Sequence, residues 1–348
     1  MTPFVLSSLV DLANLSVDSI IDVRAPSEFA QDHLPGAVNM PVLSDAERAR
    51  VGTIYTRDSP FTARKIGAAL VAQNTATHLQ GPLAGKDGGW QPLVYCWRGG
   101  QRSGAFSTIL DQVGWRVHLL KGGYKSYRSA VVRMLYDTPL PHRIILIDGG
   151  TGTAKTALLH EMATQGAQIL DLEGLAAHRG SLFGATGKDQ PAQKMFETRI
   201  AAVLGTLDPD KVTFVEAESS KIGERLLPAS LWAAMLTAPQ IRITAPLAAR
   251  SRFLCNAYAD LTTDTAAFSA LLERLRPYHP AVQIEEWRAQ VNKGAWRDLA
   301  AGLITHHYDP RYAKSVSRGD GITHPLALPD LEPSTLARAA ATLTANYR

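Results

Sequence analysis

A glycine-rich loop that ends in Lys-Thr constrains the fold of this chain more than any other feature. The apolar run 143–148 predicts a buried strand, and apolar residues at helical spacing follow the loop to about Gln165. Backbone N–H groups of such a loop wrap phosphate oxygens, the lysine supplies a cation, and the threonine hydroxyl serves phosphate or Mg²⁺. The sequence therefore predicts a phosphate-binding loop (P-loop) in an α/β domain. Its residues are Gly149, Gly150, Thr151, Gly152, Thr153, Ala154, Lys155 and Thr156.

Ala154 departs from the usual pattern, because it stands where the motif has its last glycine. Alanine fits there if its backbone is helical, so we expect the cradle to survive. A glycine turn with a purely structural role would not explain a lysine and a threonine at this spacing.

Strands and helices alternate downstream of the P-loop, which predicts a largely parallel sheet. Beyond Pro246 the pattern is mostly helical, with a loop rich in Gly, Pro and Asp near 317–333 and a final Ala-rich helix. We expect strands at 168–172, 211–216 and 240–244, and helices at 192–207 and 228–236.

Charged residues follow two of these strands and are candidates for the same site. Glu216 and Glu218 come directly after a strand, where a metal-linked or base role competes with helix capping. A second charged loop follows another strand, as ligand loops at sheet edges do. Arg250 is a candidate phosphate clamp, with a solvated helix charge as the alternative. The second loop contributes Asp171, Glu173, His178 and Arg179.

A cysteine loop lies between a buried strand at 93–96 and a helical pattern that runs to Gly114. Cys96 and Arg102 are separated by five residues, so inward N–H groups, a helix N-terminus and a guanidinium can surround an anion. The same field favours a nucleophilic thiolate at Cys96. The alternative is a cysteine that packs as a small hydrophobic residue. The other loop residues are Arg98, Gly99, Gly100, Gln101 and Ser103.

Composition bounds the class of protein without naming a substrate. The chain has 348 residues, which suggests two domains, and a net charge of +4 from scattered lysines and arginines. Its two cysteines, Cys96 and Cys255, lie far apart, so we expect a reducing, cytoplasmic location and no disulfide scaffold. The N-terminus shows neither a signal peptide nor a membrane span, and we expect no membrane partner.

The N-terminal segment, about residues 1–136, resembles the rhodanese family. The resemblance rests on Asp22-Val23-Arg24 with Glu28-Phe29, on 35–37, on the cysteine loop and on 120–124. It implies a persulfide-carrying role for Cys96. Asp22, Arg24 and Glu28 either assist it directly or brace the loop through ion pairs. The usual rhodanese loop is one residue shorter. A Cys-x5-Arg phosphatase therefore stays open, and so does a loop with room for a bulkier anion such as selenophosphate.

Three longer strings, at 95–103, 173–181 and 216–223, make the chain similar to the bacterial tRNA 2-selenouridine synthases. This resemblance implies a rhodanese-like domain (1–136) followed by a P-loop NTPase-like parallel-sheet domain with a helical C-terminal part (137–348). It implies a transferase that converts wobble 2-thiouridine of tRNA to 2-selenouridine through S-geranyl-2-thiouridine. The substrates implied are geranyl diphosphate and selenophosphate, with no tightly bound cofactor and Mg²⁺ as an optional ligand.

Partners and rivals follow from the same resemblance. The tRNA is the expected partner, and an enzyme that supplies selenophosphate is a candidate second one. Trp287, Trp296 and Tyr308 can stack on the anticodon arm if they are exposed, and otherwise belong to the core. An ATP-dependent sulfurtransferase or kinase, the Cys-x5-Arg phosphatase and a non-enzymatic tRNA-binding sulfur carrier stay as alternatives.

Overall fold

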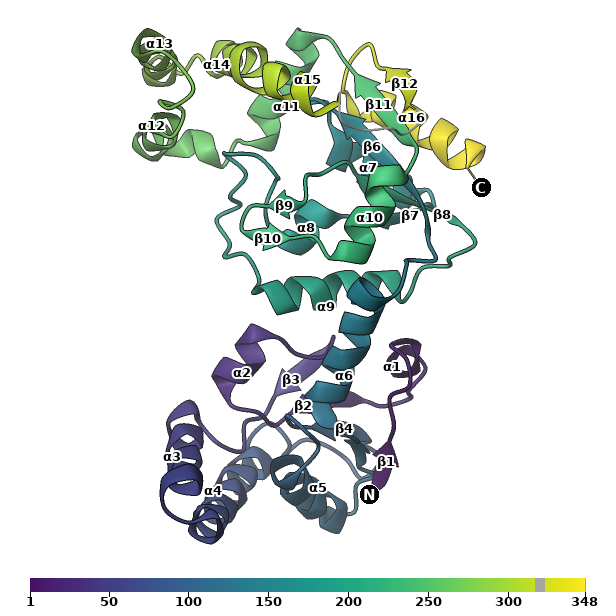
Figure 1. Ribbon diagram of the computed structural model, residues 1–348, viewed down its shortest axis with the longest axis vertical. Helices are drawn as coiled ribbons and strands as arrows, with labels where there is room; N and C mark the ends of the chain where they lie inside the picture. Colours follow the sequence, from purple (N-terminus) through teal and green to yellow (C-terminus); the bar gives the residue numbers. More distant parts are fainter. Residues whose placement is uncertain (317–322, 348) are drawn as a thin grey trace. The chain divides into compact units, whose positions relative to one another are not determined.

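The computed structural model describes residues 1–316 and 323–347, and the chain forms two compact units (Figure 1). The N-terminal unit contains 1–139 together with 190–206, and the C-terminal unit contains 140–189 and 207–348. Each unit has its own five-stranded sheet, and all neighbouring strands in both sheets run parallel. The predicted α/β fold class with parallel sheets is confirmed.

In the N-terminal unit the sheet order is β1-β5-β4-β2-β3. Strand β4 is buried along its whole length and is the central strand of the sheet. Cys96, the residue after it, therefore lies at the middle of the edge where the parallel strands end. The strands are β1 (Thr2–Phe4), β2 (Ser19–Asp22), β3 (Ala37–Asn39), β4 (Pro92–Tyr95) and β5 (His118–Leu120). The helices are α1 (Val10–Ala13), α2 (Pro26–Gln31), α3 (Asp45–Arg57), α4 (Pro60–Gln80), α5 (Gln101–Val113), α6 (Gly123–Val132), the π-helical η1 (Arg133–Asp137) and α9 (Gln193–Leu204).

Helices α3 and α4 occupy a stretch for which the sequence analysis made no prediction. The Ser44 hydroxyl accepts the Glu47 N–H, and the Glu47 carboxylate accepts the Ser44 N–H in return, which fixes the start of α3. Ser59 caps α4, and Pro60 is its first residue. These helices pack against each other, and α4 also contacts α5.

In the C-terminal unit the sheet order is β12-β11-β6-β8-β7, with β6 at the centre. The P-loop therefore leaves the middle of this sheet, as Cys96 leaves the middle of the other. The strands are β6 (Arg143–Gly149), β7 (Gln168–Leu170), β8 (Val212–Glu216), the hairpin β9 (Lys221–Ile222) and β10 (Arg225–Leu226), β11 (Gln240–Thr244) and β12 (Thr323–Ala327). The helices are α7 (Lys155–Thr164), α8 (Leu172–Ala176), α10 (Ala229–Thr237), α11 (Leu247–Ala257), η2 (Leu261–Thr263), α12 (Thr265–Glu273), α13 (Ala281–Asn292), α14 (Trp296–Leu303), η3 (Ile304–Tyr308), α15 (Asp309–Val316) and α16 (Pro333–Asn346).

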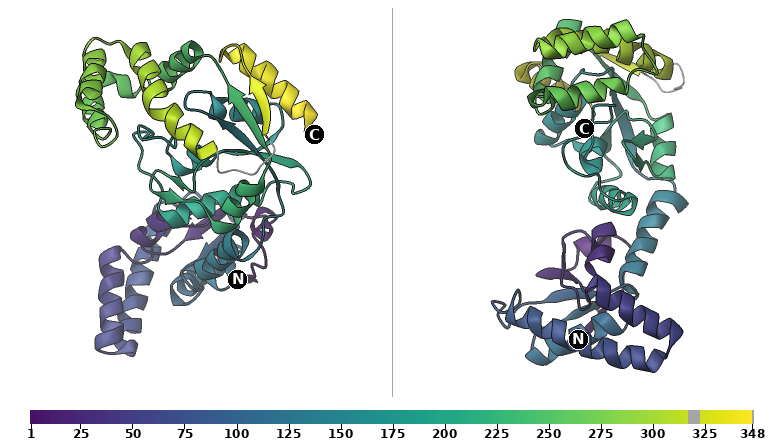
Figure 2. Two further views of the ribbon diagram at one scale, coloured as in Figure 1. Left: turned by 45° about the horizontal axis from the view of Figure 1, so that its top comes forward. Right: turned by 90° about the vertical axis from the view of Figure 1, so that its left-hand side faces the viewer.

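Helices α12, α13 and α14 group to one side of this sheet (Figures 1 and 2). They enclose a core of their own, in which Phe268, Leu272, Ile284 and Trp287 are buried. None of the helices in the described ranges has the length and apolarity needed to cross a membrane.

The expected loop near 317–333 is wrong in part, because residues 323–327 form strand β12; residues 317–322 lie outside the described residues. This strand pairs in parallel with β11 at the edge of the sheet. Pro325 has no N–H to donate, and an edge strand tolerates this because one side has no ladder partner. The proline and the flanking glycines hid the strand from pattern analysis.

Helix α9 belongs to the N-terminal unit, whereas the sequence analysis placed this helix in the second domain. It contacts α6 and η1, where Glu197 forms an ion pair with Arg128 and accepts a hydrogen bond from Tyr136. The Thr198 hydroxyl donates to Asp32 over 3.1 Å. A single boundary at residue 136 therefore does not divide the chain into its two units, because residues 190–206 return to the first one.

Candidate anion-binding sites

Cys96 lies where the sequence analysis expected it, between the buried strand β4 and helix α5. Its side chain is 4% exposed and packs within the hydrophobic core of the N-terminal unit. The Ser103 hydroxyl donates to the Cys96 sulfur over 3.1 Å. Cys96 therefore combines a packed position with a polar contact near the start of α5.

The turn at Gly122-Gly123 packs against the cysteine loop and is hydrogen-bonded to it. The N–H groups of Tyr124 and Lys125 donate to the carbonyls of Cys96 and Trp97, over 2.8 and 2.9 Å. A Cβ on Gly123 would collide with the Cys96 carbonyl oxygen, so only glycine permits this approach. The two carbonyls of the cysteine loop therefore already accept hydrogen bonds from the turn. The adjoining side chains Arg98 and Gln101 are exposed, as is Gly100.

Arg102 faces a carboxylate. Its guanidinium bonds Glu28 at 2.7 and 3.4 Å, and Glu28 also accepts from Arg48 at 2.9 Å. Burial alone would raise the pKa of Glu28, but the hydrogen bond and charge of Arg102, together with Arg48, lower it. Arg98 is exposed and makes no ion pair with the residues that the structure describes. The charge available to an incoming anion at this loop is therefore that of Arg98.

Asp22 and Arg24 pair with each other, as the bracing alternative expects. Both are buried, and their closest atoms are 2.6 Å apart. Arg24 also donates to the Asp32 carbonyl at 2.6 Å and lies 4.1 Å from the centre of the Tyr124 ring. The pair ties the end of β2 to the turn that supports the cysteine loop.

Asp32 is a buried carboxylate that the sequence analysis missed. It accepts hydrogen bonds from Tyr124 at 2.6 Å and from Thr198 at 3.1 Å, while its Oδ1 has no partner among the described residues. Burial raises its pKa, and the two hydrogen bonds oppose the shift. Because the Thr198 partner is 166 residues away, no local pattern could have indicated this contact.

The P-loop connects β6 to α7 as predicted, but Ala154 does not meet the condition of a right-handed helical backbone under which alanine fits the loop. Ala154 has φ +62° and ψ +31°, in the left-handed region, and it is buried at the start of α7. Its Cβ is strained there, and the motif's glycine would avoid this. Gly152 also has a positive φ of 81°, and a Cβ on it would lie 2.9 Å from the Leu254 side chain. The loop is therefore pressed closely onto helix α11.

Side chains of the P-loop are held mainly by the loop itself and by neighbouring acids. The Lys155 ammonium donates to the Gly149 carbonyl at 3.0 Å, and the Thr153 hydroxyl donates to the Gly150 carbonyl at 2.8 Å. The Thr156 hydroxyl donates to Glu173 at 3.0 Å. Lys155 and Thr156 thus lie in the first turn of α7, close to carboxylates.

Glu173, Glu216 and Glu218 form an acidic cluster beside Lys155. Burial, followed by the charge of a neighbouring glutamate, raises the pKa of Glu173 and of Glu216 to about 7 each. Burial likewise raises the pKa of Glu218, against the charge of Lys155. Glu216 also accepts the Glu173 N–H in the first turn of α8, over 3.1 Å, so the capping alternative is correct for this residue. No metal-binding group of three or more His, Cys, Asp or Glu side chains occurs in the part of the chain that the structure describes.

The remaining loop candidates have mainly structural contacts. Asp171 caps α8 through the Gly174 N–H at 2.7 Å and lies 2.7 Å from the His160 ring. The His178 ring accepts the Gly180 N–H at 3.2 Å, and burial lowers its pKa. Arg179 forms a two-pronged contact with Asp260, with both distances 3.0 Å.

Arg250 contacts the P-loop itself. It donates to the Thr151 carbonyl at 3.0 and 2.8 Å and to Asp309 at 2.9 and 2.6 Å. It therefore clamps the loop backbone to α15. A cavity of about 770 Å³ opens beside the loop, with Lys155, Thr156, Glu173 and Glu218 among its lining residues. This volume is in the range of small-molecule sites.

The aromatic residues considered for RNA stacking lie in the helical part of the C-terminal unit. Trp287 is 1% exposed, and Trp296 and Tyr308 are partly buried against the same core. The core alternative is therefore correct for all three. Trp97, next to Cys96, is 38% exposed and lies 5.2 Å from Tyr124 between ring centres.

Known families match both parts of the chain. A rhodanese-like domain matches residues 6–130, and the tRNA 2-selenouridine synthase AAA domain matches residues 142–283. A tRNA 2-selenouridine synthase from Nitrosomonas europaea is 35% identical over 82% of this chain and 74% of its own length. The chain belongs to the tRNA 2-selenouridine synthase family. Membership makes it an enzyme of the transferase type and confirms the resemblance on which the sequence analysis relied.

Other members extend the same picture. The tRNA 2-selenouridine synthase of Psychromonas ingrahamii is 33% identical over 70% of this chain and 66% of its own length. The chain thus spans about two thirds to three quarters of these two members of the tRNA 2-selenouridine synthase family. Among solved structures, a rhodanese with anions from E. coli covers 31% of this chain and 88% of its own, at 25% identity and a TM-score of 0.18.

Proposed function

We propose that this enzyme converts wobble 2-thiouridine of tRNA to 2-selenouridine in two steps. In the first, the thiocarbonyl sulfur attacks C1 of geranyl diphosphate, a C–S bond forms, and diphosphate leaves. In the second, selenium from selenophosphate bonds to C2 of the base and geranylthiol leaves with a proton. Water then takes the phosphoryl group from selenium and yields phosphate. Neither step needs an oxidant or a reductant.

The observation that carries this proposal is the presence of two anion-binding loops in one member of the family. Each loop leaves the central strand of a parallel sheet and opens a helix. Alkylation converts a poor leaving group into a better one, so a prenyl donor and a selenium donor serve successive steps on one base. Two different anions then require two cradles.

Roles follow from the contacts around each cradle. The P-loop binds the diphosphate, with its N–H groups and Lys155 neutralising the charge that develops on the leaving group. Thr156 supplies a hydroxyl to the same anion or to Mg²⁺. Selenophosphate lies by the cysteine loop, where Arg98 and the N-terminus of α5 attract it and the Cys96 thiol lies beside it. The exposed ring of Trp97 offers a face on which a base stacks.

The division of labour gives the N-terminal domain the selenium step and the C-terminal domain the prenyl step. Purified protein should be given tRNA that carries 2-thiouridine, with geranyl diphosphate alone, selenophosphate alone, or both. We expect S-geranyl-2-thiouridine in the first reaction, no change in the second and 2-selenouridine in the third, measured by mass spectrometry of nucleosides. Binding of tRNA with no change in nucleoside mass in any reaction would instead support a sulfur-carrier role.

A further inference from the structure

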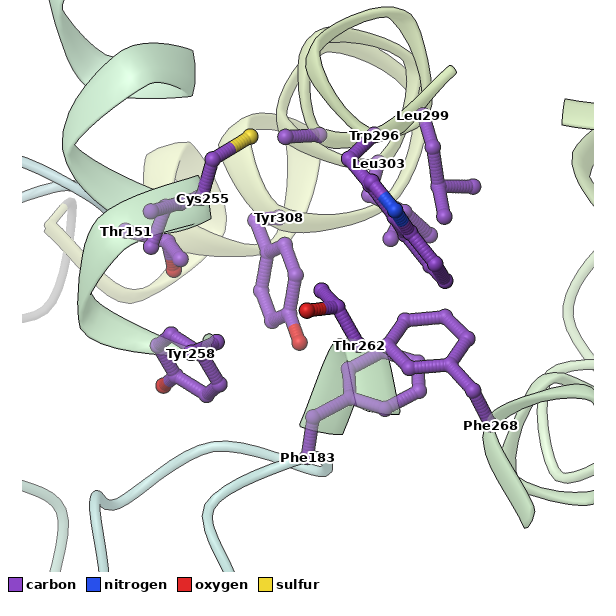
Figure 3. A pocket seen from close by; sticks show the side chains of 12 residues that line it. Thr151, Phe183, Cys255, Tyr258, Thr262, Phe268, Trp296, Leu299, Leu303 and Tyr308 are labelled. Atoms are coloured by element: carbon purple, nitrogen blue, oxygen red, sulfur yellow. The ribbon is translucent and has the colours of Figure 1, made fainter. Parts of the chain in front are cut away.

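An apolar pocket lies beside the P-loop in the C-terminal unit (Figure 3). Phe183 and Phe268 stack with ring centres 5.4 Å apart, and Trp296 meets Phe268 edge-on at the same distance. Figure 3 shows Thr151 and Cys255 on one side of the pocket and Phe268, Trp296 and Leu299 on the other. Two lining residues, Trp296 and Tyr308, were considered from the sequence only for stacking on the anticodon arm or for a place in the core.

The pocket is continuous in its lining with the cavity at the phosphate cradle. Thr151, Leu254, Tyr258 and Tyr308 line both spaces. Thr151 belongs to the P-loop, and its carbonyl is held by Arg250. A ligand whose phosphates lie in the cradle therefore has apolar space directly beside it.

The chemistry of the lining favours a hydrocarbon. No charged side chain lines the pocket among the residues the structure describes. Two of its polar groups are engaged or weak: the Tyr258 hydroxyl lies 3.2 Å from that of Ser181, and burial raises the pKa of Cys255 so that it stays a thiol. A nucleobase needs donors and acceptors that match its edge, and burying that edge without them is costly. An alkyl tail needs none.

We propose that this pocket binds the hydrocarbon tail of a prenyl diphosphate whose diphosphate occupies the P-loop. The inference rests on the proposed function, in which the prenyl donor is geranyl diphosphate. It adds where the hydrocarbon tail of the donor lies and which pocket selects the length of that tail. The empty space in the pocket is about 70 Å³, so it accepts the far end of the tail, while the nearer carbons lie in the adjoining cavity. Each methylene that leaves water contributes about a fourfold gain in affinity.

Titration of the full chain with three probes tests this assignment. The probes are inorganic diphosphate, dimethylallyl diphosphate with five carbons, and geranyl diphosphate with ten. We expect the wild-type protein to bind geranyl diphosphate at least about tenfold more tightly than dimethylallyl diphosphate. Ala300→Phe fills the pocket, so this preference should vanish while the affinity for inorganic diphosphate changes less than about twofold. Ala289→Phe, the same substitution at an exposed position of α13, should keep the preference.

The outcomes separate this inference from the proposed function. If the wild-type protein binds geranyl diphosphate no better than inorganic diphosphate, geranyl diphosphate is not its substrate. The proposed function and the pocket assignment are then both wrong. A wild-type preference that survives in Ala300→Phe overturns the pocket assignment alone and leaves a packing cavity only.

A footprint on Cys255 keeps the proposal testable if Ala300→Phe does not fold. In a Cys96→Ser background Cys255 is the single thiol, and it lines the pocket. Geranyl diphosphate should slow its alkylation by N-ethylmaleimide at least fivefold, and inorganic diphosphate should not. Equal rates with both probes would place the tail elsewhere.

Discussion

The two anion-binding loops occupy equivalent places in their sheets but differ in what their charged side chains do. At the cysteine loop, Asp22 pairs with Arg24 and Glu28 with Arg102, and the thiol is almost fully buried. At the P-loop, Lys155 and Thr156 line a large cavity beside three glutamates with raised pKa values. The first loop is thus braced by ion pairs around a packed nucleophile. The second presents its cation to an open cavity.

Replacement of the thiol should have the largest effect and should separate the two loops. Cys96→Ala should lower 2-selenouridine formation at least about 100-fold, because the thiol beside the proposed selenophosphate site is gone, while S-geranyl-2-thiouridine persists. Cys96→Ser should behave alike, and the exposed Ser129→Ala should keep both products. Nucleoside mass spectrometry is the measurement. Normal selenouridine in Cys96→Ala would remove the cysteine from the mechanism.

Loss of the P-loop cation should affect both steps. Lys155→Ala removes a charge-assisted contact worth about 1.5–3 kcal/mol, so geranyl diphosphate should bind about 10- to 100-fold more weakly. Selenouridine then falls as well, because its geranylated precursor is scarce. The matched control is Lys211→Ala, which removes an exposed lysine of the same unit. Unchanged affinity in Lys155→Ala, measured by calorimetry, contradicts the cradle.

The two arginines of the cysteine loop should differ in kind. Arg98→Ala should weaken selenophosphate binding about three- to tenfold with little change in stability, because this side chain is exposed. Arg102→Ala should mainly destabilise the N-terminal unit, since it leaves Glu28 without its closest partner. Affinity and thermal unfolding are measured on both variants. The reverse ranking would make Arg102 the anion ligand.

The acidic cluster should give the protein a pH-dependent stability. Glu216 is fully buried, and its pKa of about 7 in the folded protein exceeds its ordinary value of 4.5. The folded state binds the extra proton, so the free energy of unfolding should fall as pH rises from about 4.5 through 7, by about 1–3 kcal/mol. Glu216→Gln should flatten this slope, because an amide does not titrate in this range. The amide oxygen still accepts the Glu173 N–H, so the cap of α8 is kept.

Denaturant unfolding at pH 5 and at pH 8 measures that slope. The exposed Glu286→Gln is the control and should leave the wild-type slope intact. If Glu216→Gln and wild type lose the same stability across this range, the cluster is not protonated as described.

Relief of strain at the P-loop should have the smallest effect. Ala154→Gly should raise the free energy of unfolding by about 1 kcal/mol, because glycine adopts φ +62° without a Cβ penalty. Ala163→Gly, in the right-handed last turn of α7, should lower it instead. Two changes of the same sign would show that Ala154 is not strained.

Local patterns were enough to predict the elements that carry the two loops. The strand–loop–helix order around Cys96 and around Lys155 follows from apolar runs and glycines within some twenty residues. The family resemblance added the fold of each domain. The capping pattern Ser44-x-x-Glu47 marks the start of α3, so this helix was open to prediction from the sequence and was overlooked.

Other features were beyond local patterns for physical reasons. Glu28 and Arg102 meet across 74 residues, and Asp32 and Thr198 across 166, so only the folded chain brings them together. Ala154 adopts a left-handed backbone, although alanine itself prefers the opposite hand. The apolar pocket gathers side chains from the P-loop, from the loop at Phe183 and from several helices between α11 and η3, so no single segment indicates it.

The insertion of α9 into the N-terminal unit has a consequence for synthesis on the ribosome. Residues 190–206 complete a unit that begins at residue 1, and they emerge only after the P-loop and its first helix have been made. A nascent chain that stops near residue 139 lacks Thr198, which donates a hydrogen bond to the buried Asp32, and Glu197, which forms an ion pair with the partly buried Arg128. The first unit therefore reaches its final form late, while the second is already under way, and the two domains cannot be separated by one cut in the chain.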